Sequence, residues 1–115
     1  MVYNDSMSAK PLGEFERMVM LAVLRLAEQA HGVRICRQLE RATRRSVSRG
    51  AVYKTLDRLE KKGYVTWQVE ESTPERRRLP RRRFALTAEG LDAVRASQRV
   101  FDELSQGLED VLERG

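Results

Sequence analysis

Six arginines stand close together in one short segment of this 115-residue chain. They are Arg76, Arg77, Arg78, Arg81, Arg82 and Arg83. Like charges at this density repel one another, and contact with phosphates relieves the repulsion while it releases condensed counterions. Arginine is also favoured by the negative potential of a narrow minor groove. The segment therefore predicts binding to nucleic acid; the alternative is a surface loop whose charge Glu70, Glu71 and Glu75 partly offset.

A predicted helix over residues 48–62 carries a second basic group. Val52, Leu56 and Leu59 recur at i, i+4 and i+7, which is the spacing of one buried helix face. Ser48 suits the N-cap, and Gly63 follows the last turn as a stop. The apolar face points inward, so the basic side chains of this helix must lie outside.

The candidate DNA contacts on this helix are Ser48, Arg49, Gly50, Tyr53, Lys54 and Arg58. Near the start of a recognition helix, Arg49 could pair with a guanine through two hydrogen bonds. Lys54 and Arg58 are better suited to phosphates, and Tyr53 to a phosphate or a sugar. The small residues Ser48 and Gly50 would allow a close approach to the groove. The alternative is an ordinary amphipathic surface helix, because exposed Lys and Arg are common.

Other residues that could do chemistry point to structural roles. A single histidine, His31, and a single cysteine, Cys36, are too few for a protein-only zinc site or an intramolecular disulfide. The sequence contains no Gly-rich phosphate loop or dinucleotide fingerprint, so we expect no enzyme activity, no cofactor and no metal. Trp67 falls in a predicted strand, which favours packing in the hairpin over ligand stacking.

Charge is distributed unevenly along the chain. Residues 1–86 hold nineteen basic and ten acidic side chains, whereas residues 87–115 hold three and seven. This asymmetry predicts a basic module for a polyanion joined to an acidic segment with another task. The lone cysteine and the absence of a secretory signal or a long apolar run predict a cytoplasmic protein away from membranes.

The hydrophobic pattern predicts three helices, a two-stranded hairpin and a long final helix. The expected ranges are helices 13–27, 33–42 and 48–62, strands 64–69 and 83–86, and a helix from 87 to about 113. This order is mainly α with a small β-hairpin (α+β), and it predicts a winged helix-turn-helix fold. We expect a flexible N-terminal leader over residues 1–12, a DNA-binding domain over 13–86 and a C-terminal dimerisation helix over 87–115.

The final helix carries an apolar seam that needs a partner. The expected dimer-interface residues are Leu91, Val94, Phe101, Leu104, Leu108 and Val111. A helix of about 26 residues is roughly 39 Å long and would project beyond so small a core. Packing in an intersubunit bundle is the preferred interpretation, and packing on the helix 13–27 of the same chain is the alternative.

The chain resembles the PadR-like family of regulators. The resemblance rests on Leu12-Gly13-Glu14-Phe15-Glu16, His31-Gly32, the run from Ser46 to Val65, and Arg83 to Gly90. It covers about residues 12–112, and the central run is the most specific part. It implies a homodimeric winged helix regulator, commonly a repressor, with Tyr53 and its neighbours at DNA and the wing at the flanking backbone.

These observations predict a sequence-specific regulator that binds double-stranded DNA as a homodimer. Two-fold symmetry would match a pseudo-palindromic operator, read by the helix 48–62 and a basic wing over residues 70–83. Two alternatives stay open: a winged helix module that binds proteins, and a non-specific architectural DNA binder. The sequence identifies neither an operator nor a small-molecule effector.

Overall fold

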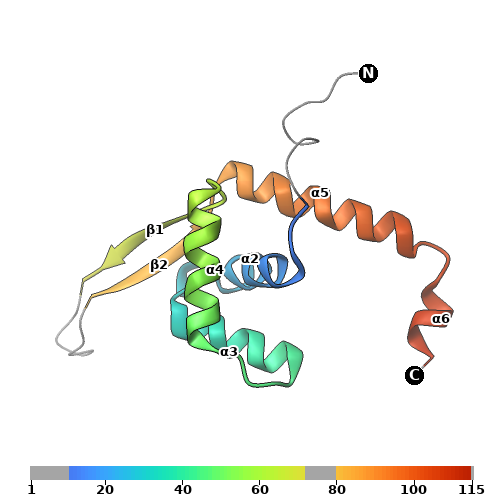
Figure 1. Cartoon of the computed structure of the whole chain (residues 1–115), viewed down its shortest axis with the longest axis horizontal. Helices are drawn as coiled ribbons and strands as arrows, with labels where there is room; N and C mark the ends of the chain where they lie inside the picture. Colours follow the sequence, from blue (N-terminus) through green and yellow to red (C-terminus); the bar gives the residue numbers. More distant parts are fainter. Residues whose placement is uncertain (1–10, 72–79, 115) are drawn as a thin grey trace, which may run out of the picture.

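The computed structural model describes residues 11–71 and 80–114 of the chain. Its elements are α2 (Glu14–Leu26), η1 (Ala27–Gln29), α3 (Gly32–Thr43), α4 (Arg49–Lys61), β1 (Val65–Glu70), β2 (Arg81–Leu86), α5 (Ala88–Ser105) and α6 (Glu109–Glu113). The hairpin and α6 lie at opposite ends of the molecule, with α2, α3 and α4 between them (Figure 1). The expected fold class, a winged helix-turn-helix with a small hairpin, is confirmed.

Helix α2 is the centre of the core. Val19, Met20 and Val23 are buried on it, and they pack against the inner faces of α3 and α4. Its first turn is closed by Glu16, whose Oε1 accepts the backbone N–H of Gly13 at 3.0 Å. The helix ends at Ala27, which has a φ of 51° and leads into the short helix η1.

The connection between α3 and α4 is held by side chains. Arg44 ends α3 in the left-handed conformation, with a φ of 58°. Glu40 accepts the backbone N–H of Val47 at 3.0 Å, and the Cys36 thiol donates to the Val47 carbonyl at 3.2 Å. Ser48 then caps α4, since its Oγ accepts the backbone N–H of Ala51 at 3.2 Å. The expected N-cap and the fully buried stripe of Val52, Leu56 and Leu59 are confirmed.

The second strand of the hairpin that forms the wing is longer than expected. Strands β1 and β2 are antiparallel, and the register runs from Val65 opposite Leu86 to Glu70 opposite Arg81. The prediction that the returning strand starts at Arg83 is therefore wrong, and Arg81 and Arg82 are strand residues. The backbone of Phe84 also donates to the Ala30 carbonyl at 2.8 Å, and an isolated β-bridge between His31 and Arg83 joins the wing to the start of α3.

The final helix is shorter than expected. Helix α5 has 18 residues and is therefore about 27 Å long, not 39 Å. Gly107, at a φ of 87°, separates it from α6, and the Ser105 hydroxyl bonds back to the Phe101 carbonyl at 2.5 Å. The prediction of one helix from 87 to 113 is wrong because this glycine takes a backbone conformation that no right-handed helix contains.

The start of α5 is fixed to the body by two close contacts. Thr87 Oγ1 accepts the backbone N–H of Gly90 at 3.0 Å and donates to the Gly63 carbonyl at 2.6 Å. A Cβ at Gly90 would lie 2.1 Å from the Tyr64 carbonyl oxygen. Gly90 therefore allows α5 to cross the chain at Tyr64 without a gap.

Candidate nucleic-acid interface

The start of α4 presents small and basic side chains outward. Ser48, Arg49, Gly50 and Lys54 are all exposed. The Arg49 guanidinium makes no hydrogen bond or ion pair with any residue that the structure describes. This end of α4 thus offers an unpaired cation beside exposed backbone, which is the arrangement needed for a contact in the major groove.

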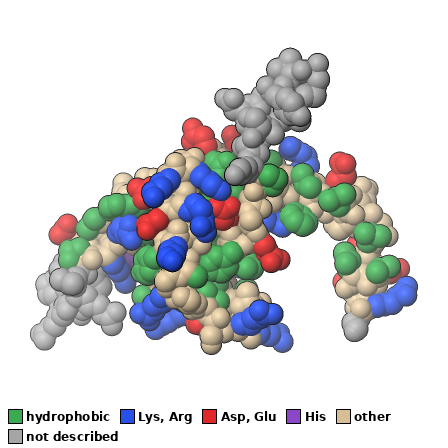
Figure 2. All heavy atoms as spheres, in the orientation of Figure 1, with side chains coloured by type: hydrophobic (Ala, Val, Ile, Leu, Met, Phe, Trp, Pro, Cys, Tyr) green, Lys and Arg blue, Asp and Glu red, His purple; other side chains and the backbone are tan. Residues whose placement is uncertain are grey.

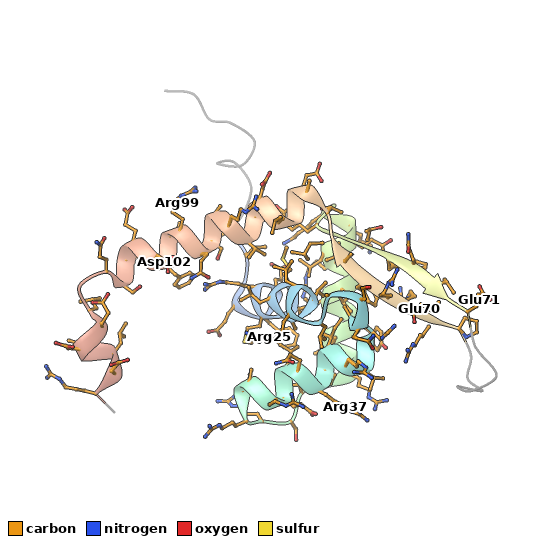
Figure 3. All side chains as sticks on the ribbon, turned by 180° about the vertical axis from the view of Figure 1, so that it is seen from behind. Arg25, Arg37, Glu70, Glu71, Arg99 and Asp102 are labelled. Atoms are coloured by element: carbon orange, nitrogen blue, oxygen red, sulfur yellow. The ribbon has the colours of Figure 1, made fainter. Side chains whose placement is uncertain are left out.

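A row of arginines on α3 extends this surface, and the sequence analysis did not include it. Arg34, Arg37, Arg41, Arg44 and Arg45 are exposed on α3 and on the turn that follows it. Lys and Arg side chains gather over α4 and around α3 (Figure 2), and Arg37 projects outward from α3 (Figure 3). The i, i+3, i+7 spacing of Arg34, Arg37 and Arg41 was the available signal, because it marks one helix face.

The sequence analysis expected Tyr53 to point freely outward, but in the structure it does not. Its side chain is half-buried, and its ring lies against the first turn of α3. A Cβ at Gly32 would meet the Tyr53 hydroxyl oxygen at 2.0 Å, so only glycine leaves room for the ring. The glycine of the His31-Gly32 pair therefore serves the placement of Tyr53.

Arg82 lies over a group of aromatic rings. Its Cζ is 5.0 Å from the ring centre of Trp67, 5.2 Å from that of Phe84 and 5.9 Å from that of Tyr53. Trp67 and Phe84 are opposite each other in the hairpin, so the expected packing role of Trp67 agrees with its position. The rings hold the Arg82 guanidinium between the wing and α4.

On the other face of the hairpin from Arg82, Arg81 of β2 contacts Glu70 of β1. Glu70 Oε1 lies 3.4 Å from Arg81 Nε and 2.8 Å from His31 Nε2, and its Oε2 is 3.7 Å from Arg83 Nη1. The hydrogen bond with His31 is the largest influence on Glu70 and, with Arg81, lowers its pKa below the ordinary value despite some desolvation. His31 and Glu70 thus attach the wing to the start of α3, a role that their sequence positions did not reveal.

Arg58 lies at the far end of α4 from Arg49. Its Nε is 3.4 Å from Glu16 Oε2, and the same oxygen accepts a hydrogen bond from Lys62 Nζ at 2.8 Å. Burial raises the pKa of Glu16, but the hydrogen bonds from Lys62 and Gly13 outweigh it, and the net pKa is lowered. The expected phosphate contact Arg58 therefore ties α4 to α2 in this structure. Arg76, Arg77 and Arg78 lie outside the described residues.

The outer half of α5 and α6 expose apolar side chains. Phe101, Leu104, Leu108 and Val111 are 53%, 69%, 46% and 63% exposed. Hydrophobic side chains follow this outer region in Figure 2. Val94, which the sequence analysis placed on the same seam, is instead buried in the core of its own chain. Its burial removes it from any surface that a partner could contact.

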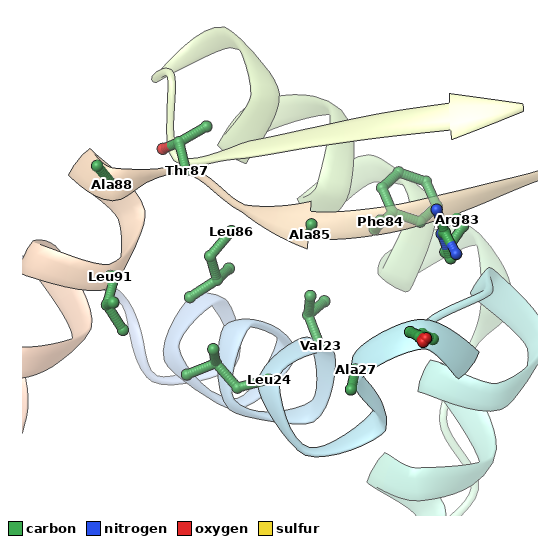
Figure 4. Close-up of a pocket in the computed structure, with 11 residues that line it drawn as sticks. Val23, Leu24, Ala27, Arg83, Phe84, Ala85, Leu86, Thr87, Ala88 and Leu91 are labelled. Carbon is green, nitrogen blue, oxygen red and sulfur yellow. The ribbon is translucent and has the colours of Figure 1, made fainter.

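A groove lies where α5 leaves the body. It has a volume of about 670 Å³ and a mainly apolar lining. Val23 and Leu24 of α2 face Leu86 of β2 and Leu91 of α5 across it (Figure 4). Leu91 is thus half-buried at the edge of the body, apart from the exposed side chains farther along α5.

The described part of the chain holds neither a cluster of metal ligands nor a membrane-spanning helix. Among residues 11–71 and 80–114, His, Cys, Asp and Glu form no group of three that could hold a metal ion. No helix in these ranges has the length and apolar character required to cross a bilayer.

A three-helix core, a hairpin wing and an exposed basic helix start define a winged helix-turn-helix protein. The model of the PadR-like family of transcriptional regulators matches residues 20–96. The chain belongs to this family, which consists of regulators and not of enzymes, and the resemblance seen in the sequence is confirmed.

Solved structures share this fold. A PadR family regulator from Eggerthella lenta is 25% identical, with 89% of this chain and 88% of that chain covered and a TM-score of 0.63. RosR of H. salinarum is 28% identical, with 93% and 84% covered and a TM-score of 0.57. A mutant of S. aureus MepR bound to an oligodeoxyribonucleotide is 20% identical, with 90% and 67% covered and a TM-score of 0.61. No curated protein sequence matches the chain.

Proposed function

We propose that this protein is a cytoplasmic repressor that binds a pseudo-palindromic DNA operator as a homodimer. In this proposal α4 reads bases in the major groove, α3 and the wing over residues 70–83 contact the backbone, and the arm over residues 87–115 joins the two subunits. The observation that carries the proposal is the exposed, unpaired Arg49 at the start of α4, next to the arginine row of α3.

The arginine row supports contact with duplex DNA over contact with a protein. Protein-binding surfaces are centred on aromatic and aliphatic anchors and are depleted of charge at their core. The exposed face around the start of α4 has the opposite composition, because Arg37, Arg41 and Arg49 are exposed there. The structure of MepR with an oligodeoxyribonucleotide is an example of a similar fold on DNA.

The arm supports assembly into a dimer. Phe101 and Leu104 are more than half exposed, and burying such side chains is worth about 1.5–3 kcal/mol each. Arg17 fixes the direction of the arm, because its Cζ lies 4.3 Å from the Phe101 ring centre and its Nη2 donates to Gln98 at 2.8 Å. A second copy that packs on this seam would set the distance between two α4 helices.

Selection of bound sites from random duplex DNA tests the proposal. We expect a palindromic motif whose half-sites are about one helical turn apart. A pool without a motif would favour an architectural DNA binder, and no retained DNA would favour a protein-binding module.

The role of α3 is tested by the double variant Arg37→Gln and Arg41→Gln. We expect the slope of log affinity against log salt to fall by about 1.8, or 0.9 for each lost phosphate contact. The matched control is Arg95→Gln with Arg99→Gln, which removes the same charge from α5, where Arg99 projects away from α3 (Figure 3). Equal slopes for the two double variants would show that α3 does not contact DNA.

A further inference from the structure

One strand residue of the wing contacts the recognition helix. Arg82 belongs to β2, and its guanidinium lies 5.9 Å from the ring centre of Tyr53 on α4. The same guanidinium lies closer to the rings of Trp67 and Phe84, which belong to the hairpin. Since the face of an aromatic ring attracts a cation, Arg82 holds rings of the two elements together.

Tyr53 also lies against α3. The missing side chain of Gly32 leaves the space that the Tyr53 hydroxyl and ring occupy, and a Cβ there would lie 2.4 Å from Cζ of the ring. Tyr53 thus contacts both the first turn of α3 and Arg82.

The face of the hairpin that carries Glu70 is attached to the first turn of α3. His31, the neighbour of Gly32, bonds to Glu70 at 2.8 Å, and Glu70 also contacts Arg81 and Arg83. One face of the wing is therefore held at the start of α3 by charge, and the other face contacts α4 through the cation of Arg82 over the Tyr53 ring. In the contact between the wing and α4, Arg82 is the strand residue that reaches the helix.

We propose that Arg82 is a positioning residue for DNA recognition: by stacking on Tyr53 and Trp67 it sets the direction of the wing relative to α4. The inference rests on the proposed function, in which helix and wing contact one duplex. A helix in the major groove and a wing on the flanking backbone must reach DNA together, so their relative angle determines how well both contacts form. Arg82 acts through Tyr53 and does not contact a phosphate.

Two substitutions of Arg82 separate positioning from phosphate contact. We expect Arg82→Ala to weaken binding to the selected DNA site by roughly five- to tenfold. This is the range expected when the interaction between two contacting residues is removed. The salt slope should stay unchanged, and Arg82→Met, which loses the cation but keeps a long side chain whose sulfur packs favourably on rings, should recover part of the affinity. A slope that falls by about 0.9 in both variants, with no recovery by Met, would identify a phosphate contact and overturn the proposal.

Coupling to Tyr53 is tested by a double-mutant cycle. Gly32→Ala places a methyl group where the Tyr53 ring lies, and its effect on affinity should not add to that of Arg82→Ala. If circular dichroism shows that Gly32→Ala does not fold, Tyr53→Leu takes its place in the cycle. Effects on affinity that multiply without coupling would overturn the proposal.

A third measurement does not depend on DNA. Trp67 is the single tryptophan of the chain, so its fluorescence reports the stacking of Arg82 in the free protein. We expect Arg82→Ala and Gly32→Ala to change the emission of Trp67, and the control Arg81→Met, on the other strand face, to leave it unchanged. An unaltered emission in Arg82→Ala would overturn the proposal. Absence of DNA binding by the parent protein would overturn the proposed function instead, with the fluorescence result still standing.

Discussion

The body formed by α2, α3, α4 and the wing differs from the arm formed by α5 and α6 in how each treats its apolar surface. The body buries Met20, Leu56 and Phe84, which are at most 2% exposed, and leaves Leu21, Leu24 and Val69 40%, 42% and 50% exposed. The outer arm leaves Leu104 and Val111 more than 60% exposed. The body is therefore stabilised within one chain, whereas the arm has an apolar face that a partner would stabilise.

Charge separates the same two regions. The first 86 residues carry a net charge of +9, and the rest carry −4. A polyanion attracts the first region and repels the second, so DNA and a second subunit can bind at separate places. The proposed function would thus place DNA recognition on the folded body and dimer assembly on the incompletely covered arm.

The largest expected effect follows from breaking the arm. In the double variant Leu104→Lys and Leu108→Lys, dimer formation would bury unpaired charges, so the dimer should dissociate. Each half-site contact then loses the high effective concentration that its twin provides, and operator affinity should fall by about a hundredfold or more. Sedimentation gives the subunit number, and a gel-shift titration gives the affinity.

The control places two lysines on exposed polar positions of the same arm, as Glu103→Lys with Gln106→Lys, which adds one more positive charge than the double leucine variant does. This variant should stay dimeric. Far-ultraviolet circular dichroism should show a folded body in both double variants. A parent protein that sediments as a monomer would contradict the division between body and arm.

The next effect concerns the place where the two regions meet. Gly90→Ala puts a methyl group 2.1 Å from the Tyr64 carbonyl oxygen, and a backbone atom cannot move aside as a flexible side chain can. We expect the free energy of unfolding to fall by about 1–3 kcal/mol, the usual cost of overpacking. Urea denaturation measures it. Gly50→Ala is the control, because its nearest atom is Ser48 Oγ at 3.5 Å, and it should leave stability unchanged or higher.

An effect of similar size, confined to one base position, is expected within the body. Arg49→Ala should reduce the binding free energy that favours one base at one position of each half-site. We expect a loss of about 1–3 kcal/mol, because a guanine contact is removed. Its stability should match that of the parent because the side chain is exposed. Binding measured on sites with each base at that position provides the test, with Lys61→Ala at the other end of α4 as control. An equal loss on every sequence would make Arg49 a phosphate contact.

The smallest effect tests how the body is held by charge. The pKa of Glu16 is lower in the folded protein than its ordinary value of 4.5. Its ionised form therefore stabilises the fold above about pH 4.5, and this contribution is lost as the pH falls through the folded pKa. Glu16→Gln should flatten the change in unfolding free energy between about pH 6 and pH 3. Urea titrations measure the unfolding free energy at each pH. If this free energy declines in parallel for parent and variant, Glu16 does not contribute to the pH dependence.

Local patterns were sufficient to predict most elements. The stripe of Val52, Leu56 and Leu59 and the Ser48 cap depend on neighbours within one helix, and the structure has both as expected. The alternation of β-branched and aromatic residues from 65 to 69 likewise placed the first wing strand. Periodicity and capping act over a few residues, so they can be recognised in a single sequence.

The directions of the site side chains came only from the tertiary structure. Tyr53, Arg58 and Arg82 look like free surface residues in the sequence, yet each lies against a residue of another element at least 21 positions away. Gly90 weakens a helix by its intrinsic preference, but the backbone of Tyr64 requires it at this position. Such contacts depend on how elements cross, and no local pattern encodes that crossing.

By itself the sequence determined the order of helices and hairpin, the basic character of the body and the apolar seam of the arm, because composition and period are local properties. Only the tertiary structure decided that α5 ends before Gly107, that Val94 belongs to the core and that the wing arginines Arg81 and Arg82 are engaged within the chain. The physical reason is that a side chain's partner is set by the packing of distant elements, and the free energy of that packing outweighs local preference.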